Sequence, residues 1–252
     1  MTYQRTHTSR IILRGSMAVI GLGLLAGCAT GPAANPDDPY ESFNRNMYSF
    51  NDGVDKAILK PVATAYHNVT PKPVRTGVSN FFANLSDAWS FVNNLLQGRG
   101  EQAMDSMVRF NVNTVFGLGG LLDIATEMGV QRHKQDFGLT LGHWGVQTGP
   151  YLVLPFLGPS TVRDTVALPV DFYGGLTGNI NDVAWRNSLY GLHIVEKRDA
   201  LLDTSDLLEA AALDRYSFTR DVYLQVRQQR IAPRKSAVDK YDEDAGKLPD
   251  DY

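Results

Sequence analysis

Apolar residues recur with helical spacing along most of the chain. The first such series has intervals of four, three and four residues and consists of Phe43, Met47, Phe50 and Val54. These intervals place the four side chains on one face of a helix that begins near Tyr40. Similar spacing predicts helices over residues 61–69, 74–96, 101–116, 161–168, 181–202 and 205–230. The pattern therefore predicts a mainly α fold with a single compact domain.

Residues 138–160 differ from this pattern because glycine and proline interrupt them repeatedly. Gly142, Gly145 and Gly149 precede an apolar segment, Tyr151–Leu157 (YLVLPFL), which itself contains Pro155. Glycine and proline at this density are typical of turns and loops. We predict a Gly/Pro-rich loop or short-strand region that carries an exposed or membrane-facing apolar segment.

The N-terminus has the pattern of an export signal. Three arginines and no acid precede a short apolar run, Ser16–Leu25, and the sequence Leu-Ala-Gly-Cys ends at Cys28. The run is too short to cross a bilayer, which needs roughly 20 apolar residues, and it matches the apolar region of a secretory signal. The last four residues resemble the bacterial lipobox. This resemblance implies cleavage between Gly27 and Cys28 and a lipid anchor on Cys28; the alternative is an ordinary signal peptide with an incidental cysteine.

Composition divides the chain into four parts. Residues 1–27 are the predicted signal peptide, and residues 28–39, with three prolines and no apolar periodicity, are a lipidated linker. Residues 40–232 form the helical domain. Residues 233–252 contain six acids and few apolar residues, so we predict an acidic disordered tail. Ala29 follows the cysteine where aspartate tends to retain lipoproteins in the inner membrane, which favours the outer membrane.

Charge and motif content exclude several classes of function. Removing the three arginines of the signal peptide leaves 21 basic and 27 acidic residues, a net charge of −6, which argues against nucleic acid as a partner. One cysteine excludes an intramolecular disulfide and a cysteine-based zinc site. The mature histidines are not spaced as a helical metal pair, and neither a G-x-S-x-G elbow nor a G-x-G-x-x-G loop is present. We therefore predict no catalytic residue, metal or cofactor.

Aromatic residues are spread through the apolar segments and allow two interpretations. They either pack in the core or face lipid, because tryptophan and tyrosine favour bilayer interfaces. A tethered domain with amphipathic helices can lie partly within one leaflet of a membrane.

Three motifs, in order, resemble a known family. They are residues 38–51 (DPYESFNRNMYSFN), 109–123 (RFNVNTVFGLGGLLD) and 136–155 (DFGLTLGHWGVQTGPYLVLP), and the sequence TVRD at 161–164 follows the third. In order and spacing, residues 38–230 are similar to the MlaA/VacJ family of outer-membrane lipoproteins.

The resemblance implies a ring-like helical domain with amphipathic membrane-embedded helices, seated beside a porin trimer in the outer membrane. A channel through the ring would let phospholipid leave the outer leaflet and reach a periplasmic carrier of the Mla system, which would keep the membrane asymmetric. No bond changes in such transport, so no catalytic residue is required. The alternatives are a structural lipoprotein that scaffolds porins without transporting lipid, and a lipid hydrolase.

The resemblance also suggests channel or hinge residues. Phe50 and Asn51 lie late in the first helix and in its motif, and we expect them to help hold the state of the channel. Gly142, Gly145 and Gly149 frame a candidate hinge loop over the channel; alternatively, they are turn glycines without a gating role.

Overall fold

The computed structural model describes residues 35–36, 38–205 and 212–231. The predicted signal peptide, Cys28 and the acidic tail 233–252 lie outside the described residues. The described helices before the sheet are α2 (Glu41–Val54), η2 (Asp55–Leu59), α3 (Lys60–Val69), α4 (Lys72–Leu96), α5 (Gly100–Val115), α6 (Ile124–Glu127) and α7 (Phe137–His143). After the strands β1 (Tyr151–Leu154) and β2 (Gly158–Thr161) come α8 (Val162–Gly174), η3 (Thr177–Asn179), α9 (Val183–Asp199) and α11 (Arg215–Ile231).

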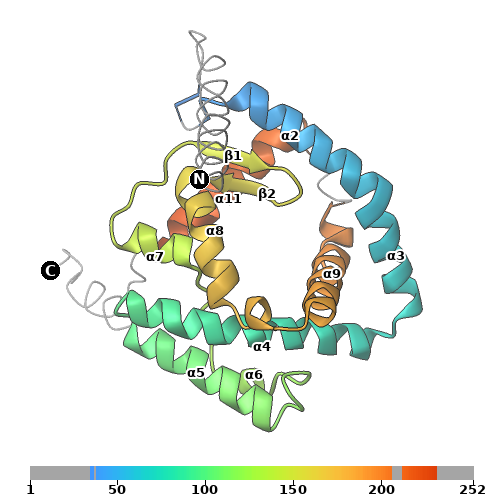
Figure 1. Ribbon diagram of the computed structural model, residues 1–252, viewed down its shortest axis with the longest axis vertical. Coiled ribbons are helices and arrows are strands. Elements are labelled where there is room, and N and C mark those ends of the chain that lie inside the picture. The colour runs from blue at the N-terminus through green and yellow to red at the C-terminus, as the bar shows by residue number, and fades with distance from the viewer. Residues whose placement is uncertain (1–34, 37, 206–211, 232–252) are drawn as a thin grey trace, which may run out of the picture.

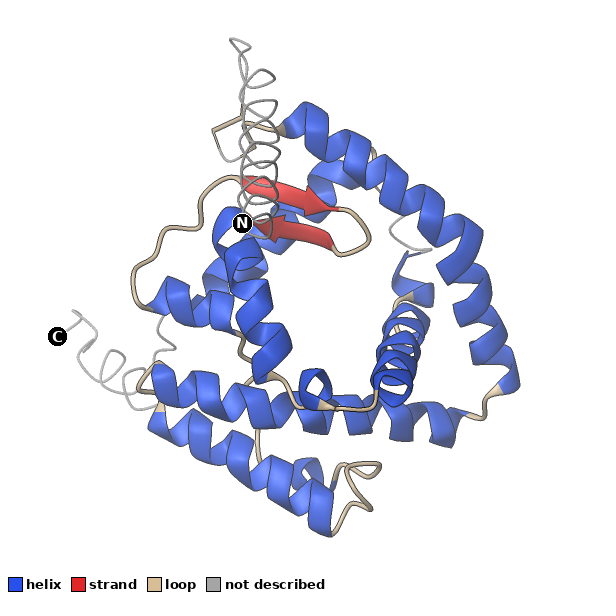
Figure 2. Ribbon diagram, viewed as in Figure 1, coloured by secondary structure: helices blue, strands red, loops and turns tan. Residues whose placement is uncertain are grey.

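The elements are arranged as a ring. In Figure 1, α2, α3, α4, α8 and the β1–β2 hairpin follow one another around it, and α9 lies on its inner side, where it packs against α3 and α4. Helices α5 and α6 lie along the outer side of α4. Figure 2 shows that helices make up the ring except at the hairpin. The predicted mainly α, single compact ring-like domain is confirmed.

One side of the ring is a nearly unbroken helical rod made of α2, η2 and α3. η2 is a π-helical stretch in which the backbone N–H of Lys60 donates to the carbonyl of Asp55. Pro61 lies within the first two residues of α3 and lacks an N–H, so the widened turn lies where a regular helical bond is lost anyway. The rod ends at Thr70, which is extended because the following Pro71 disfavours helical backbone.

The Gly/Pro-rich region forms α7, a connecting loop and an antiparallel hairpin. In the hairpin, Tyr151 pairs with Thr161 and Leu154 pairs with Gly158. Thr161 then caps α8, and its side-chain oxygen accepts from the N–H of Asp164 at 3.2 Å. α8 is longer than the predicted 161–168, because the helix continues through Pro169 to Gly174.

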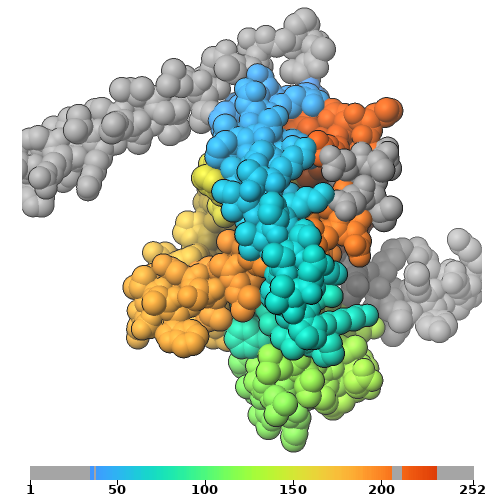
Figure 3. All heavy atoms as spheres, turned by 90° about the vertical axis from the view of Figure 1, so that its right-hand side faces the viewer, coloured from blue at the N-terminus to red at the C-terminus, as the bar shows by residue number. Residues whose placement is uncertain are grey.

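Polar residues, rather than apolar ones, fill most of the interior. Among the described residues, nine apolar residues are buried, and four of them are alanines, against twenty buried polar or charged residues. The largest fully buried side chain is that of Arg109. Conversely, large apolar side chains are exposed on nearly every helix. Figure 3, seen edge-on to the ring, shows the end of α8, η3 and the start of α9 on one side, and α11 on the other.

Most predicted helices are confirmed, with two shifts at the ends of the domain. The last predicted helix, 205–230, corresponds to α11, which begins only at Arg215. Asp38 belongs to the fold and not to the predicted linker 28–39, because its carboxylate is buried and bonded to Asn44, Tyr216 and Arg220. Among the described residues, no helix has the length and apolar character needed to cross a bilayer.

Candidate functional site

The turn of the β1–β2 hairpin is an exposed apolar tip. Phe156 and Leu157 are 72% and 70% exposed. Phe156 has φ +63° and Gly158 has φ +80°, so the turn uses left-handed backbone at two positions, one of them not glycine. In Figure 1 this turn points into the ring, whereas the segment between α7 and β1 runs along the outer side.

Phe50 and Asn51, predicted from the first motif, both contact this turn. The Asn51 side chain donates to the Leu154 carbonyl at 2.9 Å and accepts from the Phe156 N–H at 2.8 Å. The Phe50 ring meets the Phe156 ring edge-on, with centroids 5.2 Å apart. α2 therefore holds the turn through two hydrogen bonds and one aromatic contact.

Asn44, two helical turns before Asn51, makes the same pair of bonds to the hairpin, three residues earlier along its first strand. Its side chain donates to the Tyr151 carbonyl at 3.0 Å and accepts from the Val153 N–H at 2.8 Å. Seven helical residues rise about 10.5 Å, and three strand residues about 10 Å, so the two asparagines match two sites along the strand. The sequence analysis did not identify Asn44; the seven-residue interval between the two asparagines was the available signal.

Asn44 is itself held by a buried polar cluster. Its Nδ2 donates to Asp38 Oδ1 at 2.8 Å, and the Tyr216 hydroxyl donates to the other oxygen of the same carboxylate. Burial and the Asp38 carboxylate raise the pKa of Tyr216, so its hydroxyl remains a donor at neutral pH. Asn44 and Asn51 together form a clamp that holds the hairpin. The cluster joins α2, β1 and α11 and so fixes this clamp to the ring.

The predicted glycines occupy positions where glycine is needed, but they lie away from the turn. A Cβ on Gly142 would lie 2.6 Å from Ile231 Cδ1 and 2.7 Å from Arg163 Nη1. Gly145 and Gly149 have φ of +89° and +68°, respectively, and Gly145 follows the last turn of α7. Their role as a hinge loop remains a prediction.

Gly142→Ala is expected to destabilise the fold by about 1–3 kcal/mol, because the added methyl group would overpack the contact between α7 and α11. Gly191→Ala is the matched control: this glycine is also helical, but a Cβ there has nothing within 4 Å. The control should be neutral or slightly stabilising. Urea unfolding followed by circular dichroism measures both variants, and equal effects would contradict the packing role.

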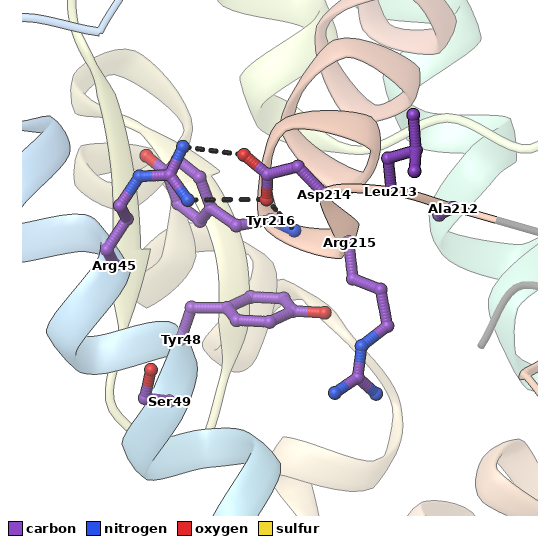
Figure 4. Close-up of a pocket in the computed structure, with 8 residues that line it drawn as sticks. All are labelled: Arg45, Tyr48, Ser49, Ala212, Leu213, Asp214, Arg215 and Tyr216. Carbon is purple, nitrogen blue, oxygen red and sulfur yellow. Dashed lines mark hydrogen bonds and ion pairs between the residues drawn. The ribbon is translucent and has the colours of Figure 1, made fainter.

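A pocket of about 310 Å³ opens between α2 and the start of α11. Figure 4 shows Arg45 and Asp214 paired across it, beside Tyr48 and Tyr216. The two closest atoms, Arg45 Nη2 and Asp214 Oδ2, are 2.7 Å apart, and the Arg45 guanidinium lies 4.5 Å from the centre of the Tyr216 ring. The hydrogen bond from Arg45 lowers the pKa of Asp214. These contacts join α2 to α11. Because Arg45 and Asp214 pair with each other, their charges are already neutralised within the pocket.

Three of the four described histidines have partners that differ from one another. His67 pairs with Asp199 at 2.7 Å, His133 pairs with Asp105 at 2.8 Å, and the ring of His193 stacks on Phe82. In the part of the chain that the structure describes, no three histidine, cysteine or acidic side chains are grouped so that they could hold a metal ion.

His193 is expected to titrate near pH 4, because burial and the neighbouring Lys197 and Lys134 lower its pKa to about 4. The unfolded chain takes up this proton near pH 6.5, so stability is lost as the pH falls from 6.5 to 4. Nuclear magnetic resonance of the imidazole measures the pKa directly. His193→Gln should flatten this part of the stability profile; an imidazole pKa near 6.5 would contradict the prediction.

Three comparisons identify related proteins. The family model described as MlaA lipoprotein matches residues 36–230. The intermembrane phospholipid transport system lipoprotein MlaA of Escherichia coli (strain K12) is 39% identical over 221 residues, which cover 84% of this chain and 86% of the relative. The protein of that description from Haemophilus influenzae is 34% identical over 247 residues, which cover 93% of this chain and 94% of the relative.

A solved structure gives the same result for the fold. It was reported in work on the structural basis for maintenance of bacterial outer membrane lipid asymmetry, and it covers 77% of this chain and 99% of its own, with a TM-score of 0.69 and 36% identity. The match to the family model spans nearly all described residues, and both relatives exceed 30% identity over most of their length. This chain therefore belongs to the MlaA lipoprotein family.

Proposed function

We propose that this protein is an outer-membrane lipoprotein that removes phospholipid from the outer leaflet and passes it to a periplasmic carrier, which maintains lipid asymmetry. The observation that carries the proposal is the inverted distribution of polarity around the ring, with ion pairs and amides inside and large apolar side chains outside. The descriptions of the relatives, intermembrane phospholipid transport and outer-membrane lipid asymmetry, support the same function.

The apolar exterior suits a bilayer. Val166, Tyr173 and Trp185 are each about 70% exposed. Tyr173 belongs to the end of α8 and Trp185 to the start of α9, the segments that project from one side of the ring in Figure 3. No lysine or arginine occurs between Arg163 and Arg186. Exposed apolar surface of this extent marks a membrane or protein contact rather than a water-facing surface. We infer that this side enters one leaflet, with Trp185 and Tyr173 near the interface.

A shielded passage is needed because phospholipid tails are costly to expose. A phospholipid has about thirty methylenes, and exposing them to water at about 0.8 kcal/mol each would cost on the order of 24 kcal/mol. A ring seated in a leaflet can offer an apolar route for the tails and a polar one for the headgroup. The transport breaks no bond, so the protein acts as a conduit and not as an enzyme.

A passive conduit needs partners that set its position and direction. We propose that a porin trimer holds the ring at the correct depth and that the periplasmic carrier withdraws the lipid. We further propose that Phe50 and Asn51 set the state of the passage through the hairpin turn, and that Gly142, Gly145 and Gly149 allow the neighbouring loop to move.

Deletion of the gene tests the function. Surface phospholipid and detergent sensitivity should both rise, and normal values in the absence of a second copy of the gene would overturn the proposal. Mass spectrometry of the protein purified with its membrane partners separates the alternatives. A porin scaffold would carry no phospholipid, whereas a lipid hydrolase would release fatty acid from phospholipid vesicles.

Cys28→Ala is expected to block maturation, because the lipid-bearing thiol is lost. We propose that Cys28 carries the anchor and that cleavage follows Gly27. The variant should therefore keep its signal peptide and lack the added mass of the lipid, which intact-protein mass spectrometry measures. Ala29→Ser is the control and should mature normally. A cleaved Cys28→Ala protein would contradict the lipobox interpretation.

A further inference from the structure

Two successive residues at the start of α8 hold the chain that leads from α7 into the hairpin, which we call the α7–β1 segment (residues 144–150). The first N–H groups of a helix have no partner inside that helix. Here the N–H of Val162 donates to the carbonyl of Pro150 at 3.1 Å. The N–H of Arg163 donates to the carbonyl of Thr148 at 3.2 Å. The first turn of α8 therefore binds the segment directly before β1.

The side chain of Arg163 contacts the same segment. Its Nη1 donates to the Thr148 hydroxyl at 3.2 Å and lies 3.5 Å from the Val146 carbonyl, at the limit of a hydrogen bond. Residues 144–147 are exposed and Thr148 is half-buried. Arg163 thus reaches Thr148 through both its backbone and its side chain, and the hold on the segment is concentrated at this threonine.

The other side of the Arg163 guanidinium is fixed by a buried ion pair. Its Nε donates to Asp164 Oδ1 at 3.0 Å, and its side chain is only 2% exposed. Asp164 also accepts from the Tyr223 hydroxyl at 2.8 Å and lies 2.8 Å from Arg227 Nη2, both on α11. Desolvation raises the pKa of Asp164, but the bonds from Arg227 and Tyr223 outweigh it and keep the pKa below its ordinary value. Arg163 is therefore anchored to α8 and α11 by a carboxylate that is ionised at neutral pH.

The two sides of this guanidinium differ in what their loss would cost. Separating Arg163 from Asp164 would leave a buried charge without its partner, which is strongly unfavourable. Separating Arg163 from the segment frees only neutral acceptors at Thr148 and Val146, and water can satisfy them because the segment is largely exposed. The segment can therefore leave while Arg163 stays paired with Asp164.

Two of the predicted glycines make room for this contact. A Cβ on Gly142 would lie 2.7 Å from Arg163 Nη1, and a Cβ on Gly149 would lie 3.1 Å from the Cβ of Val162. Both distances are tighter than ordinary van der Waals contact, so a larger residue at either position would push the chain away from α8. The glycine pattern around the segment thus has a packing role against α8.

The segment is continuous with the base of the hairpin. Tyr151 pairs with Thr161 in the hairpin, and Pro150 and Val162 follow directly outside this pair. The bond between Pro150 and Val162 therefore extends the hairpin by one step into α8. Asn51 holds the opposite end, at the turn, which points into the ring in Figure 1, whereas the segment runs along the outer side. The hairpin is thus restrained at both ends, by α2 at the turn and by α8 at the base.

We propose that Arg163 is a positioning residue that holds the α7–β1 segment and the base of the hairpin, and that release of the segment from Arg163 opens the passage. The inference rests on the proposed function and deepens it, because it names the residue that regulates the passage from outside the ring. Opening then requires the loss of neutral hydrogen bonds only, and the buried ion pair that anchors Arg163 stays intact.

Thr148→Val tests this restraint because it removes the hydroxyl and leaves the ion pair of Arg163 in place. Hydrogen–deuterium exchange of the purified full-length protein follows the amides of Val162 and Arg163, which donate to the segment. Their exchange should rise about fivefold, as expected for the loss of one ordinary hydrogen bond. In cells, surface phospholipid should rise and stay high beside a wild-type copy, because the released passage remains open.

Thr219→Val is the matched control. Thr219 is also half-buried, but its hydroxyl donates to the Arg215 carbonyl in its own helix, at 2.7 Å. This variant should change neither readout. Thr148→Ser keeps the hydroxyl and should behave like the parent, which identifies the hydrogen bond rather than the shape of the side chain as the cause.

Arg163→Lys tests the same restraint from the other partner. Lysine keeps a positive charge beside Asp164 but lacks the planar fork that lets arginine bind two groups at once. It should therefore release the segment as Thr148→Val does. Unchanged exchange in both variants would show that Arg163 does not hold the segment. If thermal unfolding shows that Thr148→Val does not fold, Thr148→Ala removes the same hydroxyl with a smaller side chain.

Failure of this inference and failure of the proposed function give different results. Normal surface phospholipid after deletion of the gene would overturn the transport function, and the exchange measurement would still report whether Arg163 holds the segment. Raised surface phospholipid after deletion, together with parent-level values in Thr148→Val cells whose protein shows raised exchange, would overturn the role of Arg163 alone.

Discussion

Replacing Arg109 with methionine is expected to cost about 3–5 kcal/mol of stability, enough to unfold much of the protein at growth temperature. Arg109 is buried between α4, α5 and α6, and its guanidinium contacts two acids. Its Nε donates to Asp87 Oδ2 at 3.3 Å, and its Nη2 donates to both oxygens of Asp123 at 2.7 and 2.8 Å. Methionine retains the apolar volume and leaves both carboxylates without this partner.

The backbone also depends on Arg109. Its Nη1 donates to the Val130 carbonyl at 2.6 Å, which holds the start of the segment that returns along α4 to α7. Desolvation raises the pKa of Asp87 even with the arginine present, so this acid should take up a proton in the variant. The loss therefore combines unpaired buried charge with a released chain segment.

Arg132→Met is the matched control because Arg132 contacts the same two acids from a more exposed position. Its Nε lies 3.2 Å from Asp87 Oδ1, and its side chain is 32% exposed. Exposed pairs contribute roughly 0–1 kcal/mol, so the control should remain folded. Thermal and urea unfolding measure both variants. Equal and small losses would show that the buried network contributes little to stability.

Acid should weaken the same network. Hydrogen bonds from Thr126, Asn113 and Arg109, opposed by desolvation, leave the pKa of Asp123 at about 2, below its ordinary value of 3.8. A lowered acid pKa stabilises the fold above the unfolded value and loses that contribution as the pH falls from 3.8 to 2. Acid sensitivity in this window adds a second readout to the Arg109 comparison.

The sequence predicts the helices well because their spacing is local. Periodicity located α2, α4 and α5 to within a few residues, Pro61 marked the first turn of α3, and Pro71 marked the end of the rod. It placed Asp38 in a linker, since a buried carboxylate is recognisable only from Tyr216 and Arg220, which lie about 180 residues further along the chain.

Helical spacing did not predict the polar interior either. Such spacing assigns the apolar face of each helix to the core, whereas here many of those faces are exposed and asparagines such as Asn93 and Asn94 are buried. In water such a distribution is unfavourable, so the pattern is typical of a surface that contacts lipid or another protein. The motif around Phe50 and Asn51 indicated the correct helix, but the backbone atoms of the turn that Asn51 binds carry no side-chain signature.

Asn51→Ala is expected to free the hairpin turn and raise surface phospholipid above the level of the parent strain. The substitution removes both bonds to the turn, to the Leu154 carbonyl and the Phe156 N–H. At about 1 kcal/mol each, their loss shifts the equilibrium toward the released turn by about thirtyfold. In the proposed function the passage is passive and phospholipid is kept out of the outer leaflet, so a passage left open should let lipid flow outward.

This outward flow distinguishes release of the turn from simple inactivation. An inactive variant should give the phenotype of the gene deletion, and a wild-type copy should restore normal surface phospholipid. An open passage should keep surface phospholipid high even beside a wild-type copy, because its leak continues. Asn46→Ala is the matched control, since this asparagine is exposed on the same helix and has no bond to the hairpin. Surface phospholipid, measured by its digestion with phospholipase added outside the cells, reports both. A recessive Asn51→Ala phenotype identical to the deletion would show that the clamp serves folding and does not set the state of the passage.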